Sequence, residues 1–461
     1  MTVNGELIKG LSSFPVVNPA TGELIAEAPS CDVETLNLAV ASAHEAFPVW
    51  SQRADRAELL LECARRLKGE TMQLARLLTA EQGKPLRESI NEIMGASLTL
   101  RHFAEITPPW MEDSSTTHSG FKILQHPLGI VAAITPWNYP IMLAMSKIAP
   151  ALIAGNTMVV KPSPYTPLTT LAIGELFRKT LPSGALNIVS GDDDLGRSMT
   201  VHPLVKMITL TGSVQTGKAV ARTAADDLKR IVLELGGNDA AIVLPDVDPA
   251  KVAEDLFWGA FRNCGQICHA IKRLYVHQTI ATQLIAELKQ IAEGIVVGDG
   301  LDRETKLGPL SNQPQLERVE ALVDSAKRDG AHIVTGGKRL ERPGYFYEPT
   351  LVADVEESTA LVREEQFGPA LPILRFSEVD DAIARANASH FGLGGSVWSN
   401  DHERAADIAK HLECGTGWVN QHGTTHPSAP GGGQKWSGIG YENGLAGLDE
   451  YTRFQTVFVA P

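Results

Sequence analysis

The sequence is short of the features that mark membrane, exported and nucleic-acid-binding proteins. No apolar run reaches the roughly 18 residues of a membrane span; the longest, residues 141–153, contains Ser146, Lys147 and Pro150. The first residues lack the charged, apolar and small-residue succession of a signal peptide, so we expect no export. Basic residues number 41 against 54 acidic ones, and the formal charge of −13 opposes binding to nucleic acid and to anionic membranes.

Cysteine is scarce, and its arrangement argues against both a disulfide framework and a metal centre. The residues are odd in number and scattered along the chain: Cys31, Cys63, Cys264, Cys268 and Cys414. Free thiols in a reducing cytoplasm are the expected state of such a set. The C-x3-C spacing of the two central cysteines differs from that of a zinc ribbon, and no matching ligand pair follows. We therefore expect a cytoplasmic, metal-free protein that acts on small molecules.

The order of helical and strand patterns predicts an α/β fold. Helical runs occupy most of the first 110 residues, and the last of them, over 87–106, is expected to end at Pro108 and Pro109 before a polar connector over 110–119. From residue 121 short apolar strands alternate with helices in two successive series. Such alternation favours parallel sheets covered by helices on both faces, which bind nucleotides beyond the carboxyl ends of their strands. Two such lobes imply a cleft between them, and the strand-like tail over 451–460 is of the kind that pairs with a partner subunit.

Two motifs at strand ends suit a nucleotide. Residues 211–217, Thr-Gly-Ser-Val-Gln-Thr-Gly, follow a strand and open a helix, where backbone N–H groups and the helix dipole receive a phosphate. The motif is not G-x-G-x-x-G, and an ordinary connecting loop explains it equally well. Lys161 also ends a strand, where its ammonium group can meet a ribose or a phosphate; a solvated lysine before the Pro162 turn is the alternative.

Three further residues have side chains that suit catalysis. Cys268 stands in a Gly/Gln loop after an apolar helix and can be reactive there, although a cysteine considered alone is more often a small buried hydrophobe. Glu234 is flanked by leucines, and desolvation raises a carboxyl pKa toward that of a general base near neutral pH; an edge-strand carboxylate in water is the alternative. Asn138 offers an amide donor that suits an oxyanion, or the side chain of an Asx turn.

Eight short motifs, in one order along the chain, together resemble the aldehyde dehydrogenase superfamily. They are Pro-Trp-Asn at 136–138, Lys-Pro-Ser at 161–163, Thr-Gly-Ser at 211–213, Glu-Leu-Gly-Gly at 234–237, Gly-Gln-Ile-Cys at 265–268, Glu-Glu-Gln-Phe-Gly-Pro at 364–369, Trp-Val-Asn at 418–420 and Ser-Gly-Ile-Gly at 437–440. Each is weak alone, but the ordered set is specific and covers essentially the whole chain. The resemblance favours the catalytic interpretations of Cys268 and Glu234.

The resemblance also implies an architecture and an assembly. It implies two Rossmann-like α/β lobes and a small β oligomerisation arm. The NAD(P)-binding domain would cover 1–117 and 127–235, the catalytic domain 236–432, and the arm with the C-terminal tail 118–126 and 433–461. The resemblance further implies a homodimer or homotetramer whose substrate is a small-molecule aldehyde.

The mechanism that the resemblance implies is hydrolytic. Cys268 would attack the aldehyde as a thiolate, and the Asn138 amide with the Cys268 N–H would hold the oxyanion. Hydride would pass to the nicotinamide, and Glu234 would activate the water that hydrolyses the resulting thioester. The implied cofactor contacts are Thr135, Pro136, Trp137, Lys161, Ser163, Pro164, Gly212, Ser213, Gly217, Leu235, Gly236, Glu365 and Phe367. By position, the substrate would contact Leu143, Ser146, Ile267 and His269.

One departure from the family pattern bears on the cofactor. Pro164 stands where many NAD-preferring members carry a glutamate that chelates the adenosine ribose. Its absence removes both a repulsion of the NADP 2′-phosphate and a hydrogen-bonding group that favours NAD, so we expect weak discrimination between the two. In the substrate region Ser146 replaces a bulky aromatic residue, which suggests room for a larger or more polar aldehyde. None of the four substrate positions carries an arginine that would bind a carboxylate.

Three rival functions stay open. A CoA-acylating member would pass the acyl group to CoA, but such members usually lack the glutamate base, and Glu234 is present. A catalytically silent relative would form no NAD(P)H with any aldehyde, and the joint presence of Cys268, Glu234 and Asn138 disfavours it. A cofactor-independent cysteine hydrolase would turn over esters without a nucleotide.

Overall fold

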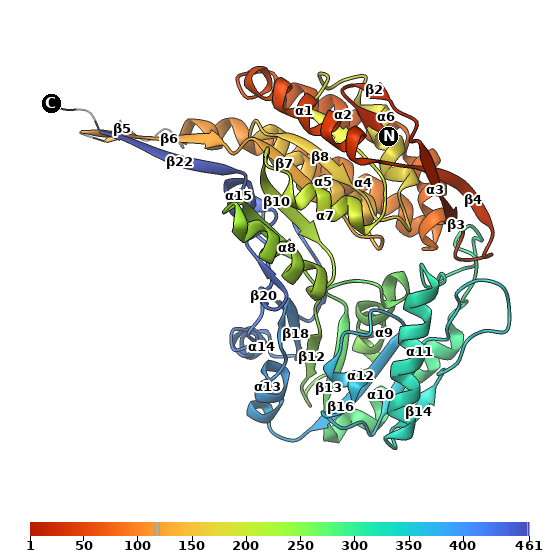
Figure 1. Ribbon diagram of the computed structural model, residues 1–461. Coiled ribbons are helices and arrows are strands. Elements are labelled where there is room, and N and C mark those ends of the chain that lie inside the picture. The colour runs from red at the N-terminus through yellow and green to blue at the C-terminus, as the bar shows by residue number, and fades with distance from the viewer. Residues whose placement is uncertain (114–116, 119, 459, 461) are drawn as a thin grey trace.

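An eight-stranded sheet organises the first lobe, with strand order β2-β1-β9-β8-β7-β10-β11-β21. The computed structural model describes residues 1–113, 117, 118, 120–458 and 460; Figure 1 shows this lobe at the top and a second lobe below it. The five central strands run parallel. The members are β1 (Thr2–Val3), β2 (Glu6–Leu7), β7 (Ile130–Ile134), β8 (Thr157–Lys161), β9 (Leu186–Ile188), β10 (Val205–Thr211), β11 (Arg230–Glu234) and β21 (Gly438–Ile439).

Helices cover both faces of this sheet because its strands are apolar on both sides. In β7, Val131 and Ala133 belong to one buried cluster, whereas Ile130 and Ala132 belong to another. The first cluster packs under α2 (Arg56–Gly69), α3 (Thr71–Gln82), α4 (Leu86–Asp113), α5 (Pro140–Ile153) and α6 (Leu168–Phe177). The second packs under α1 (Val33–Trp50), α7 (Asp193–Val201) and α8 (Val214–Asp226).

A seven-stranded sheet repeats this plan in the second lobe, in the order β14-β15-β16-β13-β12-β18-β19. Its strands run parallel except for β14. The strands are β12 (Asp239–Val243), β13 (Ile271–His277), β14 (His332–Thr335), β15 (Thr350–Ala353), β16 (Ala370–Phe376), β18 (Gly394–Trp398) and β19 (Thr416–Val419). The helices are α9 (Pro249–Phe261), α10 (Gln278–Gly294), α11 (Gln313–Arg328), the short α12 (Ala360–Arg363), α13 (Val379–Asn387) and α14 (His402–Ala409).

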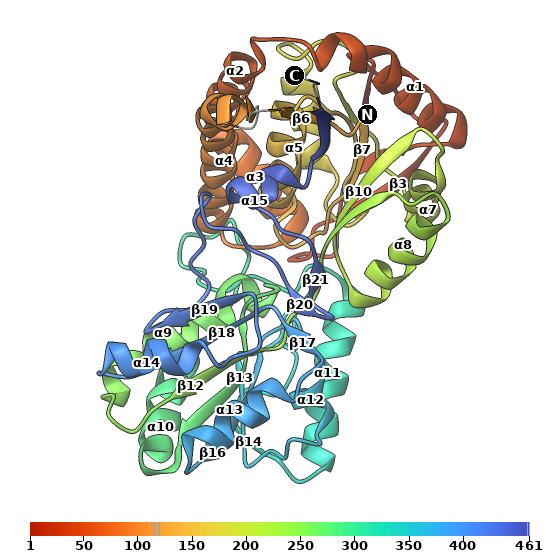
Figure 2. The same ribbon diagram turned by 90° about the vertical axis from the view of Figure 1, so that its left-hand side faces the viewer.

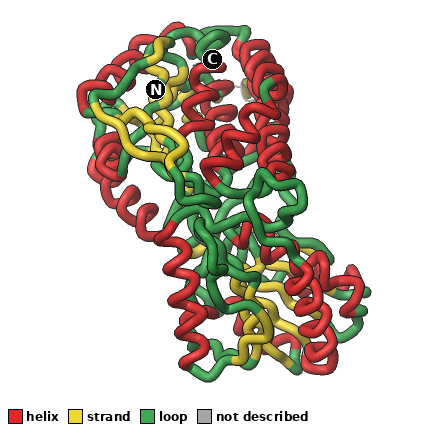
Figure 3. The backbone as a smooth tube through the Cα atoms, turned by 90° about the vertical axis from the view of Figure 1, so that its right-hand side faces the viewer, coloured by secondary structure: helices red, strands yellow, loops and turns green. Residues whose placement is uncertain are grey.

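The C-terminal part of the chain returns across both lobes. Strand β20 (Gln434–Lys435) pairs with β17 (Phe391–Gly392) of the second lobe, and β21 pairs with β11 of the first. In Figure 2 these strands lie at the junction of the lobes, and Figure 3 shows that loops, drawn green, dominate there. The junction is therefore held by backbone pairing as well as by packed side chains.

A three-stranded arm projects from the first lobe, as Figure 1 shows at its left. Strand β22 (Thr452–Phe458) pairs antiparallel with β6 (Phe121–Pro127), which pairs with β5 (Thr117–His118). Helix α15 (Gly444–Asp449) leads into β22, and a separate hairpin, β3 (Ser12–Val17) with β4 (Leu24–Ser30), extends from the N-terminal region. The tail strand predicted over 451–460 thus pairs with a strand of its own chain; pairing with a partner subunit stays a prediction.

The predicted α/β architecture with parallel sheets is confirmed, but one helix end is wrong. Helix α4 does not end at the two prolines and continues to Asp113. A proline removes one N–H bond and crowds the carbonyl four residues earlier, which weakens a helix without forbidding it. The preceding turns of α4 lie against α2 and α5 in the buried cluster, which supports the continuation. The expected connector over 110–119 is therefore helical over its first part and contains β5; residues 114–116 and 119 lie outside the described residues.

Some elements had no clear sequence pattern. Helix α7 and the strands β15 and β16 were not predicted, although β16 is central to the second sheet. Within the described part of the chain, no helix is both long enough and apolar enough to cross a membrane.

A buried ion pair fixes the first turn of α5 against α4. The Lys84 Nζ and Glu92 Oε2 atoms lie 2.6 Å apart, and both side chains are fully buried. Glu92 also accepts hydrogen bonds from the N–H groups of Ile141 and Met142, which open α5. Lys84 donates to the Asn138 carbonyl at 2.6 Å, so the pair positions the segment that carries Asn138.

Removal of one partner of this pair should destabilise the protein. We expect Lys84→Met to lower the free energy of unfolding by about 3–5 kcal/mol, because Glu92 would stay buried without its cation. The double variant Lys84→Met/Glu92→Gln should lose less, since no charge remains unpaired. Urea unfolding of both variants checks this, and equal losses in the two variants would contradict it.

Candidate active site

A tightly turned loop between α9 and β13 presents Cys268. Asn263, Cys264 and Gly265 follow one another with positive φ angles of 50°, 57° and 72°. A Cβ on Gly265 would lie 2.3 Å from the Gly368 carbonyl oxygen, so only glycine fits this close approach. Cys264 is buried in the apolar core of the second lobe, whereas Cys268 is partly exposed. The loop therefore separates a packing cysteine from one that reaches the cleft.

The buried side chain of Gln266 holds this loop in place. It donates to the Asn263 carbonyl at 2.9 Å and accepts from the Ser311 N–H at 2.8 Å. The backbone carbonyl of Gln266 accepts a hydrogen bond from the Asn138 Nδ2 atom at 2.9 Å. Asn138, which follows β7, is thereby brought beside the cysteine loop with one amide hydrogen left for a ligand.

Burial keeps the Cys268 thiol protonated in this structure. Desolvation raises its pKa to about 12; the positive charge of Lys272 opposes the rise, and the carboxylates of Glu234, Glu365 and Asp239 add to it. The Lys272 ammonium donates to the carbonyls of Ile267 at 2.7 Å and Cys268 at 2.6 Å. Without help, Cys268 would therefore carry little thiolate at neutral pH.

Glu234, at the end of β11, is a second buried acid near this thiol. Its pKa is raised well above its ordinary value by burial first and then by the charge of Glu442, while Lys147 lowers it. Lys147 forms an ion pair with Glu442, and Ser146 donates to the same carboxylate at 3.0 Å. Ser146, a predicted substrate contact, is thus buried in this network. Sequence reasoning missed Glu442 because it lies more than 200 residues beyond Glu234.

A cleft of about 790 Å³ lies beside Cys268 and Asn138, beyond the carboxyl ends of β10 and β11. It is lined by eight of the expected cofactor residues: Pro136, Trp137, Gly212, Ser213, Leu235, Gly236, Glu365 and Phe367. The remaining expected cofactor residues, Thr135, Lys161, Ser163, Pro164 and Gly217, do not line it, nor do the substrate candidates Leu143, Ser146, Ile267 and His269. Lining residues that no motif indicated include Arg318, Arg363, His390 and Trp436.

Comparison with known proteins identifies the family to which the chain belongs. The model of the aldehyde dehydrogenase family matches residues 8–457. The chain belongs to this family. It is therefore an NAD(P)-dependent oxidoreductase that acts on aldehydes.

Relatives of this aldehyde dehydrogenase share its full length. A betaine aldehyde dehydrogenase of Rhizobium leguminosarum is 37% identical, over 99% of this chain and 96% of the relative. A peroxisomal aminoaldehyde dehydrogenase of Pisum sativum is 40% identical, over 96% of this chain and 92% of the relative. The NAD+ complex of an aldehyde dehydrogenase from Bacillus cereus superposes with a TM-score of 0.96 at 33% identity, covering 100% of this chain and 96% of that one.

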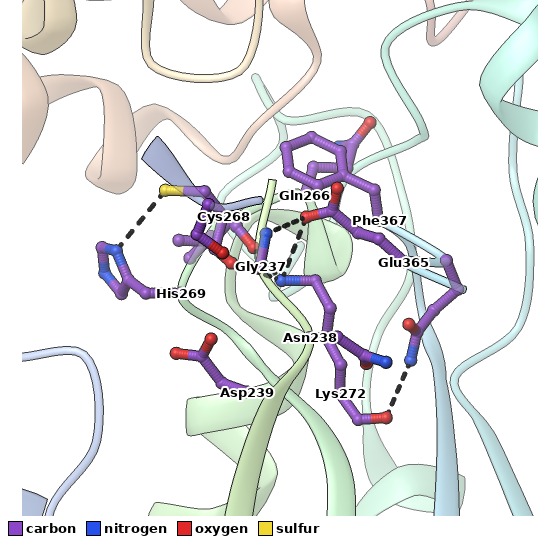
Figure 4. A network of polar contacts seen from close by, with 12 residues as sticks. Gly237, Asn238, Asp239, Gln266, Cys268, His269, Lys272, Glu365 and Phe367 are labelled. Atoms are coloured by element: carbon purple, nitrogen blue, oxygen red, sulfur yellow. Dashed lines mark hydrogen bonds and ion pairs between the residues drawn. The ribbon is translucent and has the colours of Figure 1, made fainter. Parts of the chain in front are cut away.

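The cleft of this aldehyde dehydrogenase fits a dinucleotide. Ser213 caps the N-terminus of α8 through a hydrogen bond from the Thr216 N–H, so free backbone N–H groups and the helix dipole face the cleft. The Gly237 N–H donates to the Glu365 carboxylate at 3.0 Å, and a Cβ on Gly236 would clash with that carboxylate at 2.1 Å. The Gly237–Glu365 hydrogen bond, drawn in Figure 4, holds Glu365 at the cleft wall, where a ribose hydroxyl would meet it.

Lys161 lies buried at the end of β8, outside the lining of this cleft. Burial lowers its pKa to about 8, against the charges of Asp193 and Asp192. Its ammonium makes a long 3.5 Å contact to the Pro162 carbonyl. Because the Lys161 side chain is buried, the alternative of a solvated lysine is disfavoured. An ammonium group with one weak acceptor can also bind a further polar ligand.

Proposed function

We propose that this aldehyde dehydrogenase is hydrolytic, with Cys268 as nucleophile, Asn138 as oxyanion donor and Glu234 as general base. The observation that carries the proposal is that these three residues, which are distant in sequence, lie near one another in the fold. Cys268 and Asn138 both line it, and the Glu234 carboxylate lies close enough to influence the Cys268 pKa. Asn138 follows β7, Glu234 ends β11 and Cys268 precedes β13, so the fold brings them together from three separate segments.

The first chemical step forms a bond between Cys268 Sγ and the aldehyde carbon. The carbonyl electrons move to oxygen, and the second Asn138 amide hydrogen with the Cys268 N–H stabilises that oxyanion. The Gln266 carbonyl keeps the Asn138 amide oriented. NAD(P), when bound, accepts the hydride that leaves the same carbon. Cys268 then carries a thioester.

Glu234 acts in the second half of the reaction. Its carboxylate takes a proton from water as the water oxygen attacks the thioester carbon, and the carboxylic acid leaves Cys268. Its raised pKa means that the base form appears only as the pH rises through that elevated value. The presence of this base favours hydrolysis over transfer to CoA.

Aldehydes without a carboxylate are the proposed substrate class. None of Leu143, Ser146, Ile267 and His269 offers a guanidinium to bind one. The names of the two sequence relatives, betaine and aminoaldehyde dehydrogenase, support a polar or cationic aldehyde. A panel of aliphatic, aromatic, amino, betaine and semialdehyde substrates would rank these classes.

A homodimer or homotetramer is proposed for the assembly. In the described structure β22 is an edge strand of the arm, and its Phe454 and Phe458 side chains are mostly exposed. An edge strand with exposed aromatic side chains suits pairing with a second copy.

Two variants test the catalytic roles. Cys268→Ala should abolish NAD(P)H formation, because no group remains to form the thioester. Glu234→Gln should keep a first-turnover burst of NADH and slow later turnovers by about 10²-fold or more, because water lacks its base. Stopped-flow absorbance separates the two phases. Dehydrogenation that persists in Cys268→Ala, or an acyl-CoA product formed when CoA is added, would refute the proposal.

The pH profile of hydrolysis should respond to Glu442. In Glu442→Gln the negative charge that raises the Glu234 pKa is lost while Lys147 still lowers that pKa, so the Glu234 pKa should fall. The rise of the hydrolysis rate with pH should therefore move to lower pH. Turnover between pH 5 and 10 measures the shift, with the melting temperature as a control for folding. A profile unchanged or moved upward would contradict this reading.

Cofactor preference tests the consequence of Pro164. We expect the kcat/KM values with NAD+ and NADP+ to differ by less than about a thousandfold. Pro164→Glu should shift the ratio toward NAD+, because a carboxylate beside Lys161 would repel a 2′-phosphate. A wild-type preference for NAD+ above that limit would mean that other groups, such as Asp192 and Asp193, already exclude the phosphate.

A further inference from the structure

An imidazole stands against the proposed nucleophile. The Nδ1 atom of His269 lies 3.6 Å from Cys268 Sγ, a hydrogen-bonding distance for sulfur, and Figure 4 shows the two side chains pointing toward each other. His269 does not line the cofactor cleft, so it approaches the thiol from the other side. Its position is that of a base beside a thiol rather than of a cofactor contact.

The Nε2 side of the His269 ring faces away from the thiol, toward Gly423. A Cβ on Gly423 would lie 3.1 Å from His269 Cδ2 and 3.4 Å from Nε2. In the tautomer with its hydrogen on Nε2, the Nδ1 lone pair faces the Cys268 thiol and can accept its proton.

A second histidine, His422, binds the backbone of His269. The Nε2 of His422 donates to the His269 carbonyl at 2.7 Å, and its Nδ1 lies 2.9 Å from the Ser396 hydroxyl. That hydroxyl also accepts from the Trp398 indole at 3.0 Å, so its own hydrogen is directed to the His422 ring. The chain of hydrogen bonds thus fixes the backbone of His269 through residues of β18 and of the loop after β19.

The charges around the pair keep the imidazole neutral and the thiol protonated. Burial lowers the His269 pKa to about 4, with His422 and Lys272 adding to the fall and Asp239 opposing it. Cys268 faces Lys272, which favours the thiolate, and the carboxylates of Glu234, Glu365 and Asp239, which oppose it. A neutral base next to a neutral thiol can take the proton during attack without a standing population of thiolate.

We propose that His269 is a further catalytic residue, the base that removes the Cys268 proton as the sulfur attacks the aldehyde. The inference rests on Cys268 being the nucleophile. The Sγ–H bond breaks, its proton passes to Nδ1, the S–C bond forms, and the carbonyl electrons become the oxyanion held by Asn138. When water later displaces the sulfur, the imidazolium returns its proton to the departing thiolate. Glu234 serves only the water.

The test is a pre-steady-state burst measured against pH with saturating NAD+ and aldehyde. In His269→Asn the burst at pH 7 should be slower by about 10²-fold, because only preformed thiolate can react. The variant burst should then rise about tenfold per pH unit, since the thiolate fraction grows that way below the thiol pKa. The wild-type burst should vary little over the same range, because the imidazole stays neutral there. The later hydrolytic phase should slow less than the burst, because Glu234 still activates the water although the departing thiolate loses its proton donor.

Two controls separate this role from a structural one. His332→Asn makes the same change at an exposed histidine in β14 and should leave every phase as in wild type. His269→Ala should regain burst rate when free imidazole is added, provided that its NAD+ affinity matches that of wild type. A burst that is unchanged, that falls equally at every pH without rescue by imidazole, or that shows only a raised aldehyde KM would overturn the proposal. Activity retained by Cys268→Ala would instead overturn the nucleophile itself.

Discussion

Desolvation of ionisable groups around Cys268 is the constraint on which the rest of the site depends. Burial is the first cause of the raised pKa values of Cys268 and Glu234 and of the lowered pKa of His269. In water the pKa values of these three groups would lie near their ordinary values. Burial disfavours the charged form of each group, so the proposed reaction has to move protons between neighbours. The neighbours are therefore as much a part of the site as the nucleophile.

The fold supplies those neighbours from distant parts of the chain. Glu234 ends a strand of the first sheet, whereas Cys268 precedes a strand of the second. Glu442 reaches Glu234 because β20 and β21 pair with strands of both lobes just before it. His422 comes from the loop after β19. Parallel sheets place their carboxyl ends along one edge, and two facing edges with a returning C-terminal segment bring all of these groups together.

Part of this arrangement could be predicted from local sequence, and the rest could not. The apolar runs that became β7, β8, β10 and β12 were predictable because strands buried on both faces are continuously apolar. The prediction for α4 failed because proline statistics describe isolated helices, whereas this helix is supported by packing on α2 and α5. In the site, Cys268, Glu234 and Asn138 could be selected because each stands in a short motif with neighbours that explain its chemistry.

The groups that tune those residues have no such local signal. Lys84 follows a glycine at the end of α3, and nothing near it in sequence shows that it will hold the Asn138 carbonyl. Glu442 and His422 lie in a C-terminal region whose course depends on strand pairing between lobes. His269 was predicted from its position beside Cys268 to contact substrate, but only the structure shows that its Nδ1 atom lies against the Cys268 Sγ atom.

Two acid–base pairs near the site differ in their electrostatic character. Lys84 and Glu92 are both charged, fully buried and 2.6 Å apart, which makes the pair costly to break and suitable for holding Asn138 still. Cys268 and His269 are both partly accessible and 3.6 Å apart, so a proton can pass between them as the sulfur attacks. Rigidity is needed behind the proposed oxyanion donor, and reactivity is needed at the proposed nucleophile. The charged pair lies where the first demand applies, and the thiol–imidazole pair lies where the second applies.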